Sequence, residues 1–169
     1  EVLEAADEPV PVVVLSGLHR DQIPDQLDTL GASFLNKDDM NPITFHAAIA
    51  GNFAIECDVQ ITTDGEAMVY HDDALGRLTE GTAKLATLST AELKRVPFKS
   101  TSDHMLTLGE LCELVASRVT LLVEIKSRFD GDLRLATRAA KVLAGYKGPV
   151  AVMSFDPEPM IVTKDLATA

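Results

Sequence analysis

The stretch that decides the fold is "IECDVQITTDGEAMVYHDD", residues 55–73. Its first residues belong to a strand expected over residues 53–61, in which every second residue is apolar: Phe53, Ile55, Cys57, Val59 and Ile61. Asp64-Gly65 is the signal of a two-residue hairpin turn, and "AMVYHDD" (67–73) predicts the returning strand with His71 near its end. Since side chains alternate along a strand, Glu56 and Asp58 occupy the face opposite the apolar one.

Around this hairpin, apolar strands alternate with helices. Further strands are expected over residues 10–17, 119–126 and 149–155, all buried on both faces, because their runs are nearly continuously apolar. Helices are expected over residues 42–50, 89–96, 108–117 and 132–144, and a long loop over residues 19–40. Two of the helices start with capping-box patterns, Ser89 to Glu92 and Thr107 to Glu110.

The alternation predicts an α/β protein, and polar residues at the ends of apolar strands favour a TIM (β/α) barrel. The pattern supplies roughly five strands, whereas a barrel of eight takes ~250 residues. We therefore expect residues 1–169 to be a single barrel domain that is incomplete at its C-terminus, as a fragment or through absent segments.

Charge and composition limit the partners of the chain. A formal net charge of -11 argues against binding to nucleic acid or an anionic membrane, which both require basic surface. The apolar run from Val10 to Leu15 is too short for a stable membrane insertion. Cys57 and Cys112 lack C-x-x-C spacing and favour buried thiols in a reducing, cytoplasmic compartment. A small-molecule substrate is the expected partner; the oligomeric state is not predicted.

Three carboxylates are expected to meet at one point. Glu56 and Asp58 lie on the same strand face, and Glu124 stands near the end of the strand over residues 119–126. Such a group is self-repelling without a cation, and Mg²⁺ or Ca²⁺ would relieve that repulsion through oxygen ligands. The alternative is that these acids line a solvated sheet edge.

Basic and imidazole side chains flank this acidic group. Lys126 is two residues beyond Glu124 on the same face and could bind a phosphate oxygen or simply pair with Glu124. His71 could act as a general acid or base, or could be an ordinary surface histidine. His19 and Arg20 follow the first strand, where barrels place catalytic loops, but could equally be a solvated pair.

The motifs "IECDVQITTDGEAMVYHDDALGRLTEG", "LSTAELKRV", "LTLGELCELV", "LLVEIK" and "VAVMSFDP" resemble the glycerophosphodiester phosphodiesterase family in order and spacing over residues 42–158. This resemblance implies a TIM barrel that hydrolyses glycerophosphodiesters to glycerol 3-phosphate and an alcohol with the help of Mg²⁺ or Ca²⁺. Two alternatives stay open: an inactive barrel that only binds metal or phosphate, and a related lysophospholipid or sphingomyelin phosphodiesterase.

The resemblance also assigns roles to residues of this chain. It implies that Glu56, Asp58 and Glu124 hold the metal, and that Lys126 and Arg20 bind phosphate. It further implies that His71 and His19 are the two acid/base histidines. The first-strand motif departs from the family's pattern, because "LSGLHRD" places Gly17 before the His-Arg pair and Asp21 after it.

Overall fold

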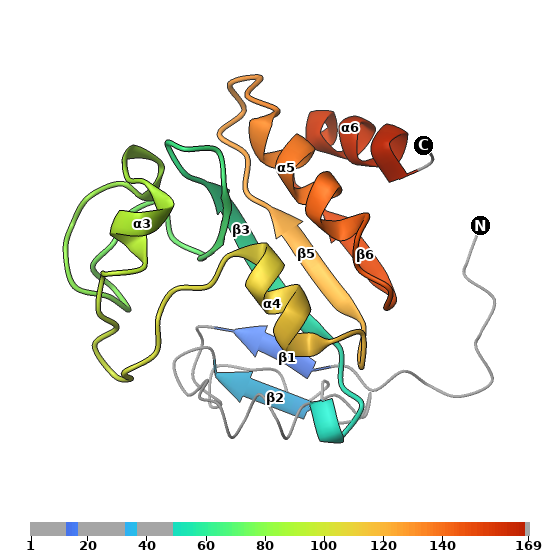
Figure 1. Cartoon of the computed structure of the whole chain (residues 1–169), viewed down its shortest axis with the longest axis horizontal. Helices are drawn as coiled ribbons and strands as arrows, with labels where there is room; N and C mark the ends of the chain where they lie inside the picture. The colour runs from blue at the N-terminus through green and yellow to red at the C-terminus, as the bar shows by residue number, and fades with distance from the viewer. Residues whose placement is uncertain (1–12, 17–32, 37–48, 168–169) are drawn as a thin grey trace. The chain divides into compact units, whose positions relative to one another are not determined.

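The computed structural model describes residues 13–16, 33–36 and 49–167, and the chain divides into two compact units between Ile55 and Glu56. The first unit contains a parallel pair of strands, β1 (Val13–Ser16) and β2 (Ser33–Asn36), in the register Val13 opposite Ser33 (Figure 1). The prediction of a long loop over residues 19–40 is therefore wrong at β2. The sequence "SFLN" has too few apolar residues to predict a strand, so only its partner β1 reveals it.

The second unit is built on a four-stranded sheet with the order β4-β3-β5-β6 (Figure 1). Its strands are β3 (Ile55–Ile61), β4 (Ala67–Val69), β5 (Leu121–Ile125) and β6 (Val150–Met153). β3 and β4 are antiparallel, whereas β5 and β6 are parallel. The strands alternate with helices after β4, so the predicted α/β class is confirmed, while the single-domain expectation stays a prediction.

Local capping chemistry starts two helices as predicted. Complete capping boxes begin α3 (Thr90–Leu93), through Ser89 and Glu92, and α4 (Leu108–Val115), through Thr107 and Glu110. A 3-10 helix, η3 (Leu85–Thr87), precedes α3, and α5 (Arg134–Leu143) joins β5 to β6. Most of the helix expected over residues 42–50 lies outside the described residues.

One helix, α6 (Pro157–Ala167), was not predicted. Its two early prolines, Pro157 and Pro159, are residues that usually indicate a loop. In the first turn of a helix, however, backbone N–H groups have no intrahelical acceptor, so proline is tolerated there. Among the described residues, no helix has both the length and the apolar character needed to cross a bilayer.

The strand β6 differs from expectation because it is not covered on both faces. Its apolar side chains Val150 and Met153 are exposed in the part of the chain that the structure describes. The reason is its place in the sheet: β6 is the edge strand, next to β5 on one side only. A continuous apolar run predicts burial only when a neighbour covers it.

The β3–β4 hairpin is confirmed, but its loop has three residues instead of two. The Thr62 amide donates to the Glu66 carbonyl at 3.0 Å, and the Gly65 amide donates to the Thr62 carbonyl at 3.2 Å. Gly65, the last of the three loop residues, takes the left-handed conformation with φ +83°, which glycine adopts without steric cost. Asp64 then accepts hydrogen bonds from the amide and hydroxyl of Thr90, both at 3.0 Å, and so ties the turn to α3.

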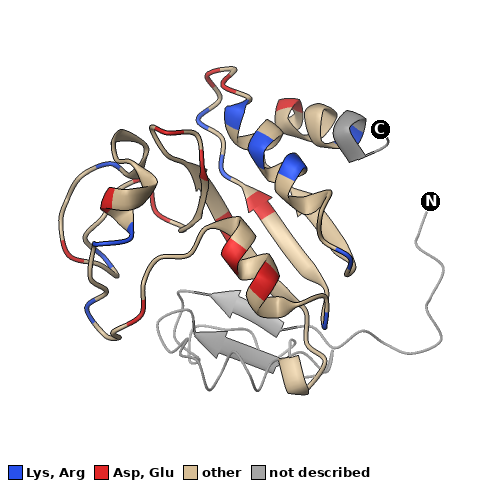
Figure 2. Cartoon of the chain, viewed as in Figure 1, with Lys and Arg blue, Asp and Glu red and all other residues tan. Residues whose placement is uncertain are grey.

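Helix α5 is attached to the same hairpin by an ion pair. The helix is basic and α4 is acidic, as Figure 2 shows. Arg138 on α5 donates two hydrogen bonds of 2.8 Å to the two carboxylate oxygens of Glu66. This bidentate contact lowers the pKa of Glu66 below its ordinary value, against the opposing effect of burial. The hairpin is thus held from both sides, by α3 and by α5.

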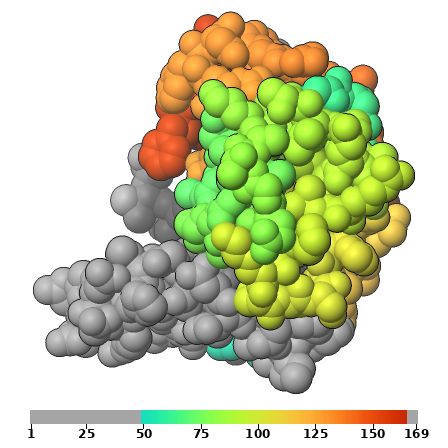
Figure 3. Space-filling view, turned by 90° about the vertical axis from the view of Figure 1, so that its left-hand side faces the viewer, coloured from blue at the N-terminus to red at the C-terminus, as the bar shows by residue number. Residues whose placement is uncertain are grey.

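The segment from β4 to the start of α4 folds around a hydrophobic core of its own side chains. Its buried members are Met68, Tyr70, Leu75, Leu85, Leu93 and Met105. Leu88, Val96 and Phe98 pack against it from the outside. Figure 3 presents this segment, coloured green to yellow, as a closely packed surface. Burial of these side chains explains why an irregular segment has a defined conformation.

Gly65→Ala is expected to lower the free energy of unfolding by about 1 kcal/mol, because a side chain is disfavoured at positive φ. The control is Gly109→Ala in the first turn of α4, where an added Cβ meets only the Thr107 hydroxyl oxygen at 3.8 Å. Urea unfolding of both variants checks this expectation. Equal effects at the two positions would contradict the assignment of strain to the hairpin.

Candidate functional site

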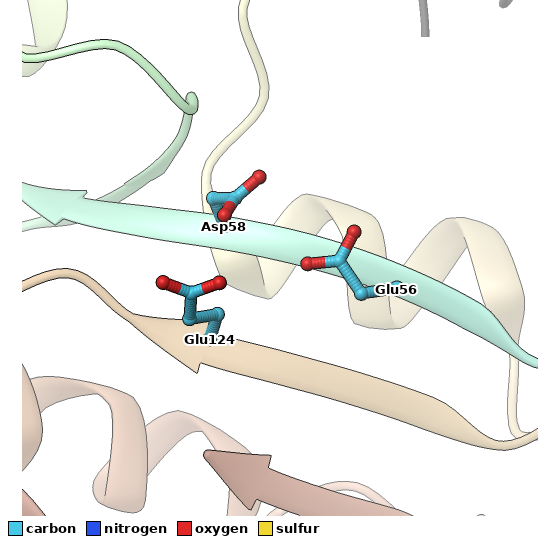
Figure 4. A group of neighbouring side chains, drawn as sticks. All are labelled: Glu56, Asp58 and Glu124. Atoms are coloured by element: carbon cyan, nitrogen blue, oxygen red, sulfur yellow. The ribbon is translucent and has the colours of Figure 1, made fainter. Parts of the chain in front are cut away.

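The three predicted carboxylates meet on one side of the sheet in the second unit. Figure 4 shows Glu56 and Asp58 on β3 facing Glu124 on the neighbouring strand β5, which runs in the same direction. One carboxylate oxygen from each residue lies within 4.8 Å of the other two. Asp58 is only 5% exposed, which excludes the solvated sheet edge as its environment.

Backbone pairing between β3 and β5 sets this arrangement. The amide of Lys126 donates to the Val59 carbonyl at 3.1 Å, immediately beyond the end of β5. This bond holds the end of β5 beside the middle of β3, with Glu124 two residues before it and Asp58 next to Val59. Residues far apart in the sequence therefore share one site because two strands are neighbours in a sheet.

Lys126 joins two of the carboxylates. Its Nζ lies 2.8 Å from Oδ1 of Asp58 and 2.8 Å from Oε1 of Glu124, and its side chain is 25% exposed. Burial acts to lower the pKa of Lys126, but the hydrogen bonds to Asp58 and Glu124 outweigh it and raise that pKa. The ammonium is therefore charged at neutral pH.

The charges of the site fit a divalent cation. With each carboxylate counted as one negative charge and the Lys126 ammonium as one positive charge, the group has a formal charge of -2. All the anionic donors are oxygens, which are the ligands that Mg²⁺ and Ca²⁺ prefer. Glu56 and Glu124 are partly exposed, so a cation has access to the group.

His71 lies two residues beyond the end of β4, in a bend, and not within the strand as predicted. Its side chain is 48% exposed, and Nδ1 lies 2.7 Å from Oδ1 of Asp72. In the neutral tautomer with its hydrogen on Nδ1, the imidazole donates a hydrogen bond to that carboxylate and leaves Nε2 available to accept a proton. The arrangement suits acid/base chemistry.

Arg77 was missed by sequence reasoning, although it stands in the same segment as the His-Asp pair. Its Nε donates to Oδ2 of Asp72 at 2.7 Å, and its Nη2 donates to Oδ1 at 3.1 Å. Burial acts to raise the pKa of Asp72, but the hydrogen bonds from Arg77 and His71 outweigh it and lower that pKa. An arginine a few residues beyond a His-Asp pair was the available signal.

A pocket of about 420 Å³ connects His71 to Lys126. Most of its lining side chains are polar or charged: Gln60, His71, Asp73, Lys84, Lys126, Ser127, Arg128, Asp130 and Asp132. Lys126 links the pocket to the carboxylate group, because it contacts Asp58 and Glu124. The structure therefore brings five of the seven predicted site residues into one region, while His19 and Arg20 lie outside the described residues.

A mixed sheet with helices between its strands, an acidic cluster on β3 and β5 and a lysine directly beyond β5 defines an α/β protein with carboxylates that could hold a metal ion. The family model of the glycerophosphoryl diester phosphodiesterase family matches residues 43–168 of this chain. The chain therefore belongs to this family, as its motifs predict.

Similar proteins agree with this family. The chain is 33% identical over 84 residues to a glycerophosphodiester phosphodiesterase of Caldanaerobacter subterraneus subsp. tengcongensis. This match covers 46% of this chain and 35% of that protein. The chain thus spans about a third of the length of this curated relative.

Solved structures of low sequence identity share the fold. A phosphodiesterase of Oleispira antarctica, in complex with the product sn-glycerol-3-phosphate, has a TM-score of 0.70 at 22% identity. That match covers 92% of this chain and 62% of the other. A glycerophosphodiester phosphodiesterase of Agrobacterium tumefaciens has a TM-score of 0.62 at 21% identity, covering 75% of this chain and 56% of the other.

Asp72→Asn is expected to reduce stability at pH 7 and to have progressively less effect in acid. The folded pKa of Asp72 lies below its unfolded value of 3.8, so its stabilising contribution is fully present above pH 3.8. It is lost as the pH falls through the folded pKa. Urea unfolding of wild type and variant between pH 7 and pH 2 measures the difference.

Arg77→Met removes the ion pair with Asp72 by replacing its other member. The loss of stability in this variant is expected to decrease over the same acidic range as in Asp72→Asn. A difference from wild type that is independent of pH in both variants would show that the carboxylate charge of Asp72 is not what stabilises this turn.

Proposed function

We propose that the chain carries the metal-binding half of the active site of a glycerophosphodiester phosphodiesterase. This enzyme would be a metal-dependent phosphoric diester hydrolase that releases glycerol 3-phosphate and an alcohol. The observation that carries the proposal is the meeting of three carboxylates on the neighbouring strands β3 and β5, two of which, Asp58 and Glu124, also contact Lys126. Membership of the family supports it, as does the product sn-glycerol-3-phosphate bound to the structurally similar phosphodiesterase of Oleispira antarctica.

Glu56, Asp58 and Glu124 would hold the divalent cation, Mg²⁺ or Ca²⁺. When bound, such a cation polarises a phosphoryl oxygen and lowers the pKa of a coordinated hydroxyl group. The formal charge of the site and its all-oxygen donors support this assignment. All three side chains come from the neighbouring strands β3 and β5.

Lys126 would bind a non-bridging phosphate oxygen, and so would offset the charge that develops on phosphorus substituents in the transition state. His71 would exchange a proton with the attacking or the departing oxygen, since it lines the same pocket as Lys126. His19 and Arg20 stay predictions for the second histidine and a second phosphate ligand.

The four-stranded sheet would be part of a (β/α) barrel, incomplete at the C-terminus of this chain. The apolar side chains of Val150 and Met153 that β6 exposes support this view. A cytoplasmic location, expected from the two cysteines, stays a prediction.

Hydrolysis of glycerophosphocholine is expected to be lost on treatment with EDTA and restored by Mg²⁺ or Ca²⁺. Glu56→Gln removes one anionic ligand, and His71→Ala removes the proton-transfer group, so each should lower kcat by ~10²-fold or more. Glu113→Gln, an exposed glutamate on α4, is the control and should keep wild-type activity. Release of glycerol 3-phosphate is the readout, and wild-type rates in either site variant would refute the assignment.

The same assay separates the two alternatives. An inactive barrel would bind Mg²⁺ or Ca²⁺ in calorimetry and hydrolyse no glycerophosphodiester. A lysophospholipid or sphingomyelin phosphodiesterase would turn over long-chain substrates in preference to glycerophosphocholine.

Lys126→Met is expected to make the chelator-treated protein less stable by about 1–2 kcal/mol, because Asp58 and Glu124 lose their shared countercharge. Added Mg²⁺ or Ca²⁺ should raise the melting temperature of this variant by more than that of wild type, since the cation replaces the missing charge. Thermal unfolding with EDTA and with each cation measures both effects.

The matched control for that experiment is Lys141→Met, an exposed lysine on α5 that makes the same change in net charge. A cation response of Lys126→Met no larger than that of Lys141→Met would argue against a metal site at these carboxylates.

A further inference from the structure

Three backbone carbonyl oxygens converge on one buried side chain, that of Gln60. This residue lies on β3, two residues beyond Asp58, and is 8% exposed. Its Nε2 donates to the carbonyl oxygens of Tyr70 at 3.4 Å, His71 at 3.1 Å and Asp72 at 2.5 Å. The two amide protons are thus shared among three consecutive peptide groups.

The shared hydrogen bonds matter because the chain leaves the sheet at this point. β4 ends at Val69, and the amide of Tyr70 still donates to the Asp58 carbonyl at 3.0 Å. Beyond Tyr70 the backbone bends, with its carbonyl dipoles directed to one place. Partially negative oxygens so close together repel each other unless a donor lies between them, and a buried acceptor without a donor costs about 1–3 kcal/mol.

We propose that Gln60 is the positioning residue of His71. It holds the backbone of Tyr70, His71 and Asp72 against β3, and so directs the imidazole into the pocket that Gln60 and Lys126 also line. This inference rests on the proposed function, in which His71 exchanges a proton with the substrate. Gln60 itself does not take part in proton transfer.

The position of Gln60 on β3 gives this anchor a specific role. Asp58 and Gln60 project from the same face of one strand, since they are two residues apart. Asp58 directs its carboxylate toward Lys126 and Glu124, and Gln60 anchors the bend formed by residues 70–72, here called the His71 bend. The separation between the proposed metal ligands and the proposed acid/base group is therefore set by a single rigid element. Catalytic rates are sensitive to such spacing, because an error of ~1 Å can cost ~10²-fold.

Two substitutions of Gln60 separate the anchor from simple packing. Gln60→Met keeps the length of the side chain and removes its donors, while Gln60→Lys has an ammonium with three donors for the three carbonyl oxygens. For glycerophosphocholine we expect Gln60→Met to lower kcat by ~10- to 100-fold with KM within ~2-fold of wild type. Gln60→Lys should recover most of that loss.

The matched control is Thr62→Val, directly beyond the end of β3. Thr62 is also buried, and its hydroxyl accepts from the Glu66 amide at 2.8 Å inside the hairpin. Its loss should reduce stability and leave kcat unchanged. A kcat for Gln60→Met within twofold of wild type would overturn the proposal, as would a Gln60→Lys variant that folds and recovers nothing.

A second readout is independent of activity. The ¹³C chemical shifts of the Tyr70, His71 and Asp72 carbonyls, measured without metal or substrate, should move in Gln60→Met and return toward wild type in Gln60→Lys. Unchanged shifts in Gln60→Met overturn the anchor. If the wild-type protein hydrolyses no glycerophosphodiester, the proposed function fails, and shifts that still move in Gln60→Met support the anchoring of the bend by Gln60.

Discussion

The ion contacts of Lys126 with Asp58 and Glu124 are the interaction on which the candidate site depends. Carboxylates from two adjacent strands are held close together in a partly buried place, where their repulsion is poorly screened. One ammonium, 2.8 Å from each of the two, offsets only part of that charge. The remaining negative charge is what makes the site suited to a divalent cation, and the same lysine extends into the neighbouring pocket.

Strand β3 connects this electrostatic requirement to the fold. Its apolar residues Ile55, Val59 and Ile61 are buried, yet so are Asp58 and Gln60 on its other face and Thr62 directly beyond its end. Buried polar groups have to be hydrogen-bonded, and each of these three has a different partner: Lys126, the carbonyls of residues 70–72, and the hairpin. A strand of this kind organises its surroundings, because a change at any of the three leaves a partner unsatisfied.

Sequence patterns predicted the elements whose signals are local. The capping boxes at Ser89 and Thr107 and the glycine of the hairpin act within a few residues, so they were found where expected. β2 and α6 were missed, because "SFLN" is short and the prolines of α6 resemble a loop. The exposure of β6 was also missed, since burial depends on a neighbouring strand and not on the apolar run itself.

The sequence by itself determined that Glu56, Asp58 and Gln60 share one face of a strand, because alternation is a property of the extended backbone. It also placed Glu124 and Lys126 on one face of another strand. Only the tertiary structure decided that these faces meet, that Arg77 pairs with Asp72, and that Gln60 holds the His71 bend. The physical reason is that strand pairing and burial, which act between distant residues, set these distances, whereas local periodicity sets only the direction of each side chain.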